Sequence, residues 1–367
     1  MKVECGRDKL KNAVMSLERV TVKNPSLPVL QSILLETRDK SLILKATNLD
    51  VGLEITIPAK IEKNGSVALS GNVLGSFLSG LSSDETIKLD IINNNLLIST
   101  KRNSTVIKSY PIDDFPIIPK IEKENRFTIE TEKLVSGIKS VVYASSLSDM
   151  KPEISSVYLY SDVGELIFVS TDSFRLSEKR FNLKVSGEEG VSIILPYKNA
   201  IEAARIFEGS TEVLDVYFNK NQIFIVSPTI YFTSRVVSGV FPDYKQIIPK
   251  DKKSEVVVLK RDLVDSIKIS NIFSDKFNKV NLKIIPSDSL FEISSKNQDK
   301  GESSTTLAAT VEGEDVNVSL NAKYLLDCVP FIEGDSVHIV FNGNNKAIII
   351  KGIGDKSFLY LVMPMNA

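Results

Sequence analysis

The sequence predicts an α+β fold made of three tandem copies of one domain, each with two helices and an antiparallel sheet. The first observation behind this prediction is an amphipathic helical pattern that occurs three times along the 367-residue chain. The second is an asparagine-containing hairpin signal that follows the second helix of each copy. The copies recur about 125 residues apart. This period is far too long for a solenoid repeat, so each copy is expected to be a domain with its own core.

Each copy opens with a helix whose apolar residues are spaced for one buried face. These first helices are expected over residues 7–20, 132–145 and 261–273. Their apolar faces consist of Leu10, Val14 and Leu17, then Leu134, Ile138 and Val141, then Leu263, Ile267 and Ser270. A second helix begins after Leu69, Leu195 and Leu320, at spacings of 195−69=126 and 320−195=125. These second helices are expected over residues 72–81, 197–207 and 323–332.

Alternating or continuous apolar runs between and after the helices predict β-strands. They are expected over residues 41–46, 51–57, 86–91, 96–100, 165–170, 213–218, 222–227, 290–294, 337–341 and 346–351. The last two strands of each copy flank a turn at residues 93–95, 219–221 or 342–344. Because the connections are too short for repeated βαβ crossovers, the sheets are expected to be antiparallel, with one face covered by the two helices.

Two stretches that combine proline with charged residues mark the expected domain boundaries. Pro119 precedes a charged run at 120–125, and Pro249 precedes one at 250–254. The expected domains are residues 1–122, 123–250 and 251–367.

The composition is that of an ordinary soluble globular protein, with 43% hydrophobic and 25% charged residues. No apolar run approaches the length of a membrane span, and the first residues lack the apolar segment of a signal peptide, so a cytoplasmic protein is expected. The formal net charge of −1 argues weakly against a dedicated nucleic-acid binder. It permits a protein whose basic residues are gathered on one surface.

The residues that usually carry catalysis or metal binding are scarce. Cys5 and Cys328 are the only cysteines, which excludes a disulfide framework and favours two small core residues. The single histidine, His338, lies in a strand pattern with no second histidine to share a metal. Glycine-rich phosphate loops and nucleophile-elbow motifs do not occur. The sequence therefore predicts a protein that is not an enzyme and needs no metal or cofactor.

Three motifs occur in order at residues 171–176 (TDSFRL), 239–249 (GVFPDYKQIIP) and 360–367 (YLVMPMNA), with two weaker ones at 26–30 (SLPVL) and 47–50 (TNLD). Together these motifs resemble the bacterial DNA polymerase III beta subunit family, the replication sliding clamps. The resemblance covers the whole chain, and it implies a head-to-tail homodimer that closes into a ring around double-stranded DNA. It further implies sequence-independent contacts to DNA and binding of the replicative polymerase, the clamp loader and repair proteins through short apolar peptides, typically of the kind Gln-Leu-x-Leu-Phe.

The resemblance also implies a peptide-binding pocket between the second and third copies. Its walls, carried over position by position, are Ile154, Thr171, Ser173, Phe174, Arg175, Leu176, Pro242, Gln246, Ile247, Phe277, Asn321, Tyr324, Asn345, Ala347, Leu361, Val362, Met363, Pro364 and Met365. Methionine suits a groove that accepts several peptides, because its side chain is flexible and polarizable. The alternative is that residues 361–365 are simply the final strand, packed on its own domain.

The first copy holds a counterpart of the pocket turn, because residues 47–50 correspond to residues 171–174 at 171−47=124. A turn present in both copies is expected to be structural, with its Thr and its Asn or Asp capping backbone donors. Only the second turn is expected to have a pocket role. Phe174 stands where the family commonly has histidine or tyrosine, and Asn366-Ala367 replaces a basic-then-aliphatic ending, so the preferred peptides are expected to differ.

The resemblance places Lys23, Asn24, Lys151 and Lys198 on the side that faces DNA. The family often has arginine where Asn24 stands, and Lys23 is a possible substitute. For the dimer interface we expect Ile107, on an edge-strand candidate, together with Ile272 and Phe273 after a helix. Burial of these three side chains inside their own domains is the alternative.

Three classes of function remain open from the sequence. The first is a DNA-encircling clamp, the second is a β-rich protein-interaction scaffold that does not encircle DNA, and the third is a hydrolase whose site has no familiar motif. The near-neutral charge and the single histidine argue against the third.

Overall fold

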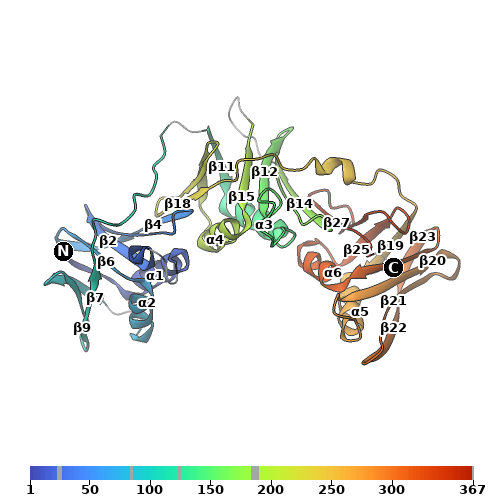
Figure 1. Ribbon diagram of the computed structural model, residues 1–367, viewed down its shortest axis with the longest axis horizontal. Helices are drawn as coiled ribbons and strands as arrows, with labels where there is room; N and C mark the ends of the chain where they lie inside the picture. Colours follow the sequence, from blue (N-terminus) through green and yellow to red (C-terminus); the bar gives the residue numbers. More distant parts are fainter. Residues whose placement is uncertain (23–26, 83–85, 123–124, 183–189, 366–367) are drawn as a thin grey trace. The chain divides into compact units, whose positions relative to one another are not determined.

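The computed structural model of the chain describes residues 1–22, 27–82, 86–122, 125–182 and 190–365 (Figure 1). Within these residues the chain forms two compact units. The first covers residues 1–135 and 202–236, and the second covers residues 136–182, 190–201 and 237–365. The elements expected for the central copy are therefore divided between the two units.

The first unit contains helices α1 (Arg7–Val20) and α2 (Gly71–Gly80), which pack side by side (Figure 1). Its smaller sheet has the order β5-β1-β7-β8-β9, and its larger sheet has the order β10-β6-β2-β3-β4-β18-β17-β16-β11. The strands are β1 (Lys2–Gly6), β2 (Ser32–Arg38), β3 (Ser41–Thr47), β4 (Val51–Pro58), β5 (Lys60–Lys63), β6 (Ser66–Ser70), β7 (Thr86–Ile92), β8 (Asn95–Ser99), β9 (Ser104–Ile107), β10 (Ser109–Tyr110), β11 (Asn125–Glu130), β16 (Val213–Phe218), β17 (Gln222–Val226) and β18 (Ile230–Arg235). A short 3₁₀ turn, η1 (Pro28–Gln31), precedes β2.

The second unit contains helices α5 (Lys260–Ile272) and α6 (Ala322–Cys328), which also pack against each other. Its larger sheet has the order β15-β12-β13-β14-β27-β26-β25-β19-β23, and its smaller sheet has the order β22-β21-β20-β24. The strands are β12 (Ser156–Asp162), β13 (Glu165–Thr171), β14 (Arg175–Asn182), β15 (Ser192–Pro196), β19 (Ser254–Leu259), β20 (Lys279–Ile285), β21 (Leu290–Asn297), β22 (Gly301–Leu307), β23 (Ala309–Gly313), β24 (Val316–Asn321), β25 (Ser336–Phe341), β26 (Ile348–Gly352) and β27 (Phe358–Val362). The 3₁₀ turns are η2 (Tyr244–Ile247), η3 (Pro286–Asp288) and η4 (Val329–Phe331). The remaining helices of the chain are α3 (Thr131–Val142) and α4 (Tyr197–Phe207).

The two larger sheets run across the boundaries expected between copies. In the first unit β4 pairs with β18, so that Leu53 lies opposite Phe232. In the second unit β14 pairs with β27, so that Leu176 lies opposite Leu361. Without these partners each strand would expose unpaired backbone groups at a sheet edge. Neighbouring copies therefore share a sheet, while one buried cluster consists of residues of the third copy, from Val256 to Val362, as expected for a domain with its own core.

A side-chain hydrogen bond recurs in all three copies and supports the repeat. The first residue of each copy's first helix donates to a carbonyl at or beyond the end of the second helix, where carbonyls lack helical partners. The pairs are Arg7 Nε–Leu78 O (3.0 Å), Arg7 Nη2–Leu81 O (2.6 Å), Thr131 Oγ1–Glu212 O (2.6 Å) and Lys260 Nζ–Ile332 O (2.7 Å). Three different side chains at one position of the repeat thus donate an equivalent hydrogen bond.

Most of the predicted elements are confirmed. The expected helix at 197–207 and strand at 213–218 coincide with α4 and β16, and the strand pairs of the described chain are antiparallel. The predicted apolar faces of the first helices are buried. The predicted helix at 323–332 was too long. It ends at Cys328 and passes into η4, because Pro330 has no N–H to continue the helical hydrogen bonds.

Candidate functional site

The turn between β13 and β14 is shaped by two side chains that bind its backbone. Thr171 Oγ1 accepts a hydrogen bond from the Ser173 N–H (3.1 Å) and donates one to the Arg175 carbonyl (2.7 Å). Asp172 Oδ1 accepts from the N–H groups of Phe174 and Arg175, both at 2.9 Å. Ser173 adopts a left-handed φ of 77°. The result is a tight, fully bonded turn that leaves the Phe174 side chain 64% exposed.

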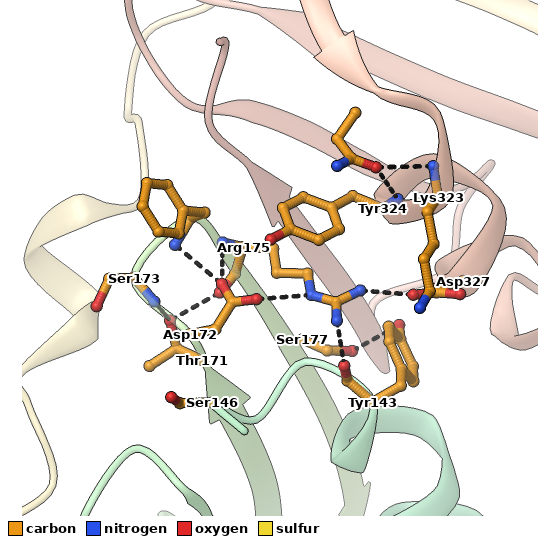
Figure 2. A network of polar contacts seen from close by, with 12 residues as sticks. Tyr143, Ser146, Thr171, Asp172, Ser173, Arg175, Ser177, Lys323, Tyr324 and Asp327 are labelled. Carbon is orange, nitrogen blue, oxygen red and sulfur yellow. Dashed lines mark hydrogen bonds and ion pairs between the residues drawn. The ribbon is translucent and has the colours of Figure 1, made fainter. Parts of the chain in front are cut away.

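Arg175 is the centre of a polar network that ties this turn to the C-terminal domain (Figure 2). Its Nε lies 3.0 Å from Asp172 Oδ2 and its Nη1 lies 2.7 Å from Asp327 Oδ2. Its Nη2 donates to the Tyr143 carbonyl, and the Tyr324 ring centroid is 4.2 Å from the guanidinium carbon. The Arg175 side chain is 10% exposed. With both acidic partners on the same guanidinium, Arg175 joins residues of the central and C-terminal domains.

The charge of Arg175 is stabilised by its surroundings. Burial alone would lower the pKa of the guanidinium, but the Tyr360 oxygen, Asp327 and Asp172 outweigh that effect and raise the pKa above its ordinary value. Burial raises the pKa of the Tyr143 and Tyr360 hydroxyls as well. The network is therefore a fixed cation between two carboxylates, with neutral tyrosines around it at physiological pH.

The last residues of the chain lie beside the same turn. Strand β27 is inserted between β14 and β26, and the Met363 N–H continues the pairing by donating to the Phe174 carbonyl at 2.8 Å. Leu361 and Val362 are buried, whereas Met363 is 39% exposed. Leu361 and Val362 belong to the final strand, as the alternative expected, but this strand does not pack on its own domain alone, because it pairs with β14 of the central copy as well as with β26. The same strand also brings an apolar edge to the turn.

A groove of about 630 Å³ opens between these segments. Twelve of the expected pocket residues line it: Thr171, Ser173, Phe174, Arg175, Leu176, Gln246, Ile247, Asn345, Ala347, Leu361, Val362 and Met363. Its remaining walls were not predicted and consist of Ile248, Pro249, Lys250, Asp251, Asn342 and Lys346. These six residues lie next to the predicted residues Gln246, Ile247 and Asn345 in the sequence. Extending the predicted segments by a few residues would have found them.

The other expected pocket residues lie outside the groove lining. They are Ile154, Pro242, Phe277, Asn321, Tyr324, Pro364 and Met365. Ile154 is 9% exposed and belongs to the core, whereas Phe277 is 56% exposed. The Asn321 side-chain amide donates to the Phe277 carbonyl at 3.1 Å, and the Met365 N–H donates to the Ser319 carbonyl at 2.8 Å.

Two of the four residues expected to face DNA, Lys151 and Lys198, have described positions. Lys198 is exposed on α4, with its Nζ 3.9 Å from Asp149 Oδ2, and Lys151 is exposed in the segment between α3 and β12. Lys23 and Asn24 lie outside the described residues.

The residues expected at a dimer interface differ in exposure. Ile272 is 63% exposed at the end of α5, and Phe273, which follows it, is partly exposed. Ile107 lies on the edge strand β9, but it is only 5% exposed, because its side chain packs inside its own domain. On this strand the exposed apolar residue is Val106, at 59%.

The two cysteines are buried, and the histidine is bonded to a carboxylate on a neighbouring strand. Cys5 and Cys328 are buried as predicted, and burial raises the pKa of the Cys5 thiol to about 12. His338 Nε2 lies 2.7 Å from Glu255 Oε2 on the neighbouring strand, a partner that the sequence did not reveal.

Among residues with described positions, no group of three His, Cys, Asp or Glu side chains is placed to hold a metal ion. In the same part of the chain, no helix has the length and apolar character that crossing a bilayer requires.

Family models match nearly the whole chain in three consecutive pieces. The N-terminal domain of the DNA polymerase III beta subunit matches residues 1–119, its central domain matches residues 128–243, and its C-terminal domain matches residues 245–366. The beta sliding clamp of Bacillus subtilis (strain 168) is 25% identical over 378 residues, with all of both chains covered.

Solved structures show the same fold. The DNA polymerase sliding clamp from Bacillus subtilis matches with a TM-score of 0.94 and 24% identity, over 100% of this chain and 99% of that one. The DnaN sliding clamp from Pseudomonas aeruginosa bound to griselimycin matches with a TM-score of 0.95 and 23% identity, over 100% of each chain.

Proposed function

Because the chain belongs to the DNA polymerase III beta subunit family and functions as a DNA sliding clamp, we propose that two copies of it pair head to tail into a ring around duplex DNA. The observation that carries this proposal is the threefold build, which the family models match domain by domain in chain order. Two such subunits supply six domains, and a two-fold axis lets the same pair of edge strands, β9 of one subunit and β22 of the other, meet at both junctions.

In this proposal the first domain of one subunit meets the third domain of its partner. Strand β9 ends one sheet of the first unit and β22 ends one sheet of the second, so both can accept a further strand. Ile272 and Phe273 supply apolar surface near β22, since Phe273 lies about 4 Å from the Cβ position of Gly301. On β9 the exposed Val106 is our candidate for this interface, because Ile107 is buried.

Retention on DNA then comes from topology rather than from affinity, which agrees with a net charge of only −1. Contacts to DNA are electrostatic and directed at phosphates, because a sliding ring cannot read bases. Lys151 and Lys198 are our candidates within the described chain, and Lys23 and Asn24 are candidates beyond it.

We further propose that the groove beside Phe174 and Met363 binds short apolar peptides of the polymerase, the clamp loader and repair proteins. Its apolar floor of Leu176, Ala347 and Leu361 and its methionine rim support this use. The expected residues outside the lining, such as Phe277 and Tyr324, are proposed to contact longer peptides.

The remaining parts of the proposal follow from the clamp function. The protein acts as a non-catalytic scaffold in the cytoplasm, with domains at residues 1–122, 123–250 and 251–367. The competing function is a β-rich scaffold that binds proteins without encircling DNA.

Retention on a nicked circular plasmid distinguishes the two functions. Labelled protein, loaded by its clamp loader, is expected to stay on the closed circle and to leave within minutes once the plasmid is cut. Equal loss from circular and linear DNA would support the scaffold instead. Sizing of the purified protein is expected to give a dimer.

Deletion of residues 363–367 tests the groove separately. It removes Met363 from the rim and is expected to abolish binding of a Gln-Leu-Ser-Leu-Phe peptide while leaving the dimer intact on sizing. Unchanged peptide affinity would remove the groove from the proposal without affecting the ring.

A further inference from the structure

A buried glutamate occupies the same position in the first two copies. Glu54 lies on β4 and Glu178 lies on β14, at a spacing of 178−54=124 that equals the spacing of Thr47 and Thr171. They are 8% and 1% exposed. Both strands are the ones that pair with the next copy, so each glutamate lies where two copies share a sheet. A carboxylate this buried needs hydrogen-bond or ionic partners.

In the first unit the partner comes from the last residues of the first copy. Lys120 Nζ lies 2.6 Å from Glu54 Oε1 and 4.2 Å from the centroid of the Tyr231 ring. The Tyr231 hydroxyl donates to the Pro119 carbonyl at 3.0 Å and accepts from the Ile121 N–H at 3.1 Å. This segment is therefore fastened by one ion pair and one tyrosine hydroxyl.

In the second unit the partner again comes from the last residues of the copy, but it is a tyrosine hydroxyl instead of a lysine. The Tyr244 hydroxyl donates to Glu178 Oε2, while Arg180 Nε lies 2.6 Å from Glu178 Oε1. The Tyr160 hydroxyl lies 2.6 Å from the Tyr244 hydroxyl. Tyr244 itself is 5% exposed, so its hydroxyl is held from two sides in a nearly dry site.

The contact of Tyr244 with Glu178 differs from that of Lys120 with Glu54, because the residues that follow Tyr244 reach the groove. Tyr244 is the first residue of η2, and the following residues Gln246 and Ile247 form a wall of the groove. The Tyr244 ring also shares a small core with Leu176 and Leu361, two residues of the groove floor. The hydroxyl therefore fixes the wall relative to the floor from beneath.

We propose that Tyr244 is a positioning residue for the peptide groove, which acts through its hydrogen bond to Glu178 by holding the wall of Gln246 and Ile247 at binding distance from the floor. This inference rests on the proposed peptide-binding function. Tyr244 does not line the groove, so its effect is on preorganisation rather than on contact.

The test compares Y244F with Y231F in the full chain, using a fluorescein-labelled Gln-Leu-Ser-Leu-Phe peptide and fluorescence anisotropy. Each variant loses one hydroxyl that fastens an interdomain segment and keeps the aromatic ring. Y244F is expected to weaken peptide binding about tenfold, which corresponds to about 1.4 kcal/mol, mainly through faster dissociation. Y231F is expected to bind within about twofold of the original protein, because its segment does not reach the groove. Y160F, which removes one neighbour of the Tyr244 hydroxyl, is expected to give an intermediate loss.

Hydrogen exchange supplies a readout that general destabilisation would not reproduce. In Y244F the amides of residues 245–248 are expected to exchange faster, while those of residues 171–176 keep their protection. Peptide affinity of Y244F within twofold of the original, or an equal loss in Y231F, would overturn the positioning role. Failure of the original protein itself to bind the peptide would instead refute the proposed peptide function.

Discussion

The turns at residues 47–51 and 171–175 have the same backbone and different surroundings. In the first turn Thr47 Oγ1 accepts from the Leu49 N–H (3.0 Å) and donates to the Val51 carbonyl (2.8 Å), as Thr171 does in the second. Asn48 Oδ1 accepts from the N–H groups of Asp50 (3.0 Å) and Val51 (2.7 Å), where Asp172 does so in the second turn. Leu49 and Ser173 both adopt a φ of 77°. The prediction that this turn is structural in origin is supported bond by bond.

The residues that meet each turn explain why only one adjoins the groove. The Arg235 N–H donates to the Asp50 carbonyl at 2.8 Å, just as the Met363 N–H donates to the Phe174 carbonyl at 2.8 Å. In the first turn the two side chains are charged, with Arg235 Nε 4.0 Å from Asp50 Oδ1. In the second they are an exposed phenylalanine and a methionine. One repeat position thus carries a solvated ion pair in one copy and an apolar rim in the other.

The largest expected effect comes from the two arginines near these turns. R175A leaves the carboxylates of Asp172 and Asp327 without their cation, and is expected to lower the unfolding free energy by about 3 kcal/mol. R235A removes an ion pair whose side chains are 66% and 67% exposed, and is expected to cost no more than about 0.5 kcal/mol. Urea unfolding of both variants measures the difference. Similar costs would mean that the buried network adds nothing to the second turn.

The next largest effect is expected when the charged side chains beside the first turn are introduced beside the second. The double variant F174D/M363R copies the pair of Asp50 and Arg235. It is expected to weaken binding of the Gln-Leu-Ser-Leu-Phe peptide by about 2–3 kcal/mol, because an apolar peptide then meets charged groups. Anisotropy titration measures this loss, and the matched variant D50F/R235M is expected to leave peptide affinity unchanged. Full peptide binding by F174D/M363R would show that the rim does not distinguish the two turns.

A smaller effect tests the shared backbone. T47V and T171V each remove a hydroxyl that both accepts and donates within its turn, and both residues are 7% exposed. Each change is expected to cost about 1–2 kcal/mol of stability, nearly equally in the two turns. Only T171V is expected to lower the affinity for the peptide, because only the second turn lines the groove. Unequal unfolding midpoints would indicate that the two turns are not equivalent in energy.

The smallest effect concerns Lys245, which follows Tyr244. The hydrogen bond from Lys245 lowers the pKa of Asp162, and the bonded atoms are 2.6 Å apart. Since the folded pKa is depressed, the stabilisation is present above the unfolded pKa of about 3.9 and is lost as the pH falls through the folded pKa. The pair is partly exposed, so K245M is expected to cost only about 0.5 kcal/mol at pH 7. The difference between the two proteins in urea unfolding should shrink below about pH 4. A constant difference from pH 7 to pH 3 would assign the effect to packing instead.

Local features were predictable from the sequence because local forces decide them. The buried faces of the first helices were predicted correctly from their apolar spacing, and the Thr-capped turns were recognised from residue types that bind their own backbone. The pairing of β14 with β27 was not predicted, since its partners are separated by most of two domains and its register depends on the packed sheet.

The groove was predicted in outline through the family resemblance, but its polar support was not. Arg175 and Asp327 are both residue types that normally face solvent, and nothing in their spacing links them. The same holds for Glu178, whose burial and bond to Tyr244 depend on the fold around them. Charged residues acquire such roles only when distant segments bring them together.

Photo-cross-linking of a Gln-Leu-Ser-Leu-Phe peptide to the full chain tests most directly whether the second turn, and not the first, forms the binding site. With a photoreactive group on the peptide's phenylalanine, mass spectrometry is expected to locate the cross-links on residues 171–176, 246–251 and 361–363. Cross-links concentrated on residues 47–51, or distributed over both turns, would contradict the account.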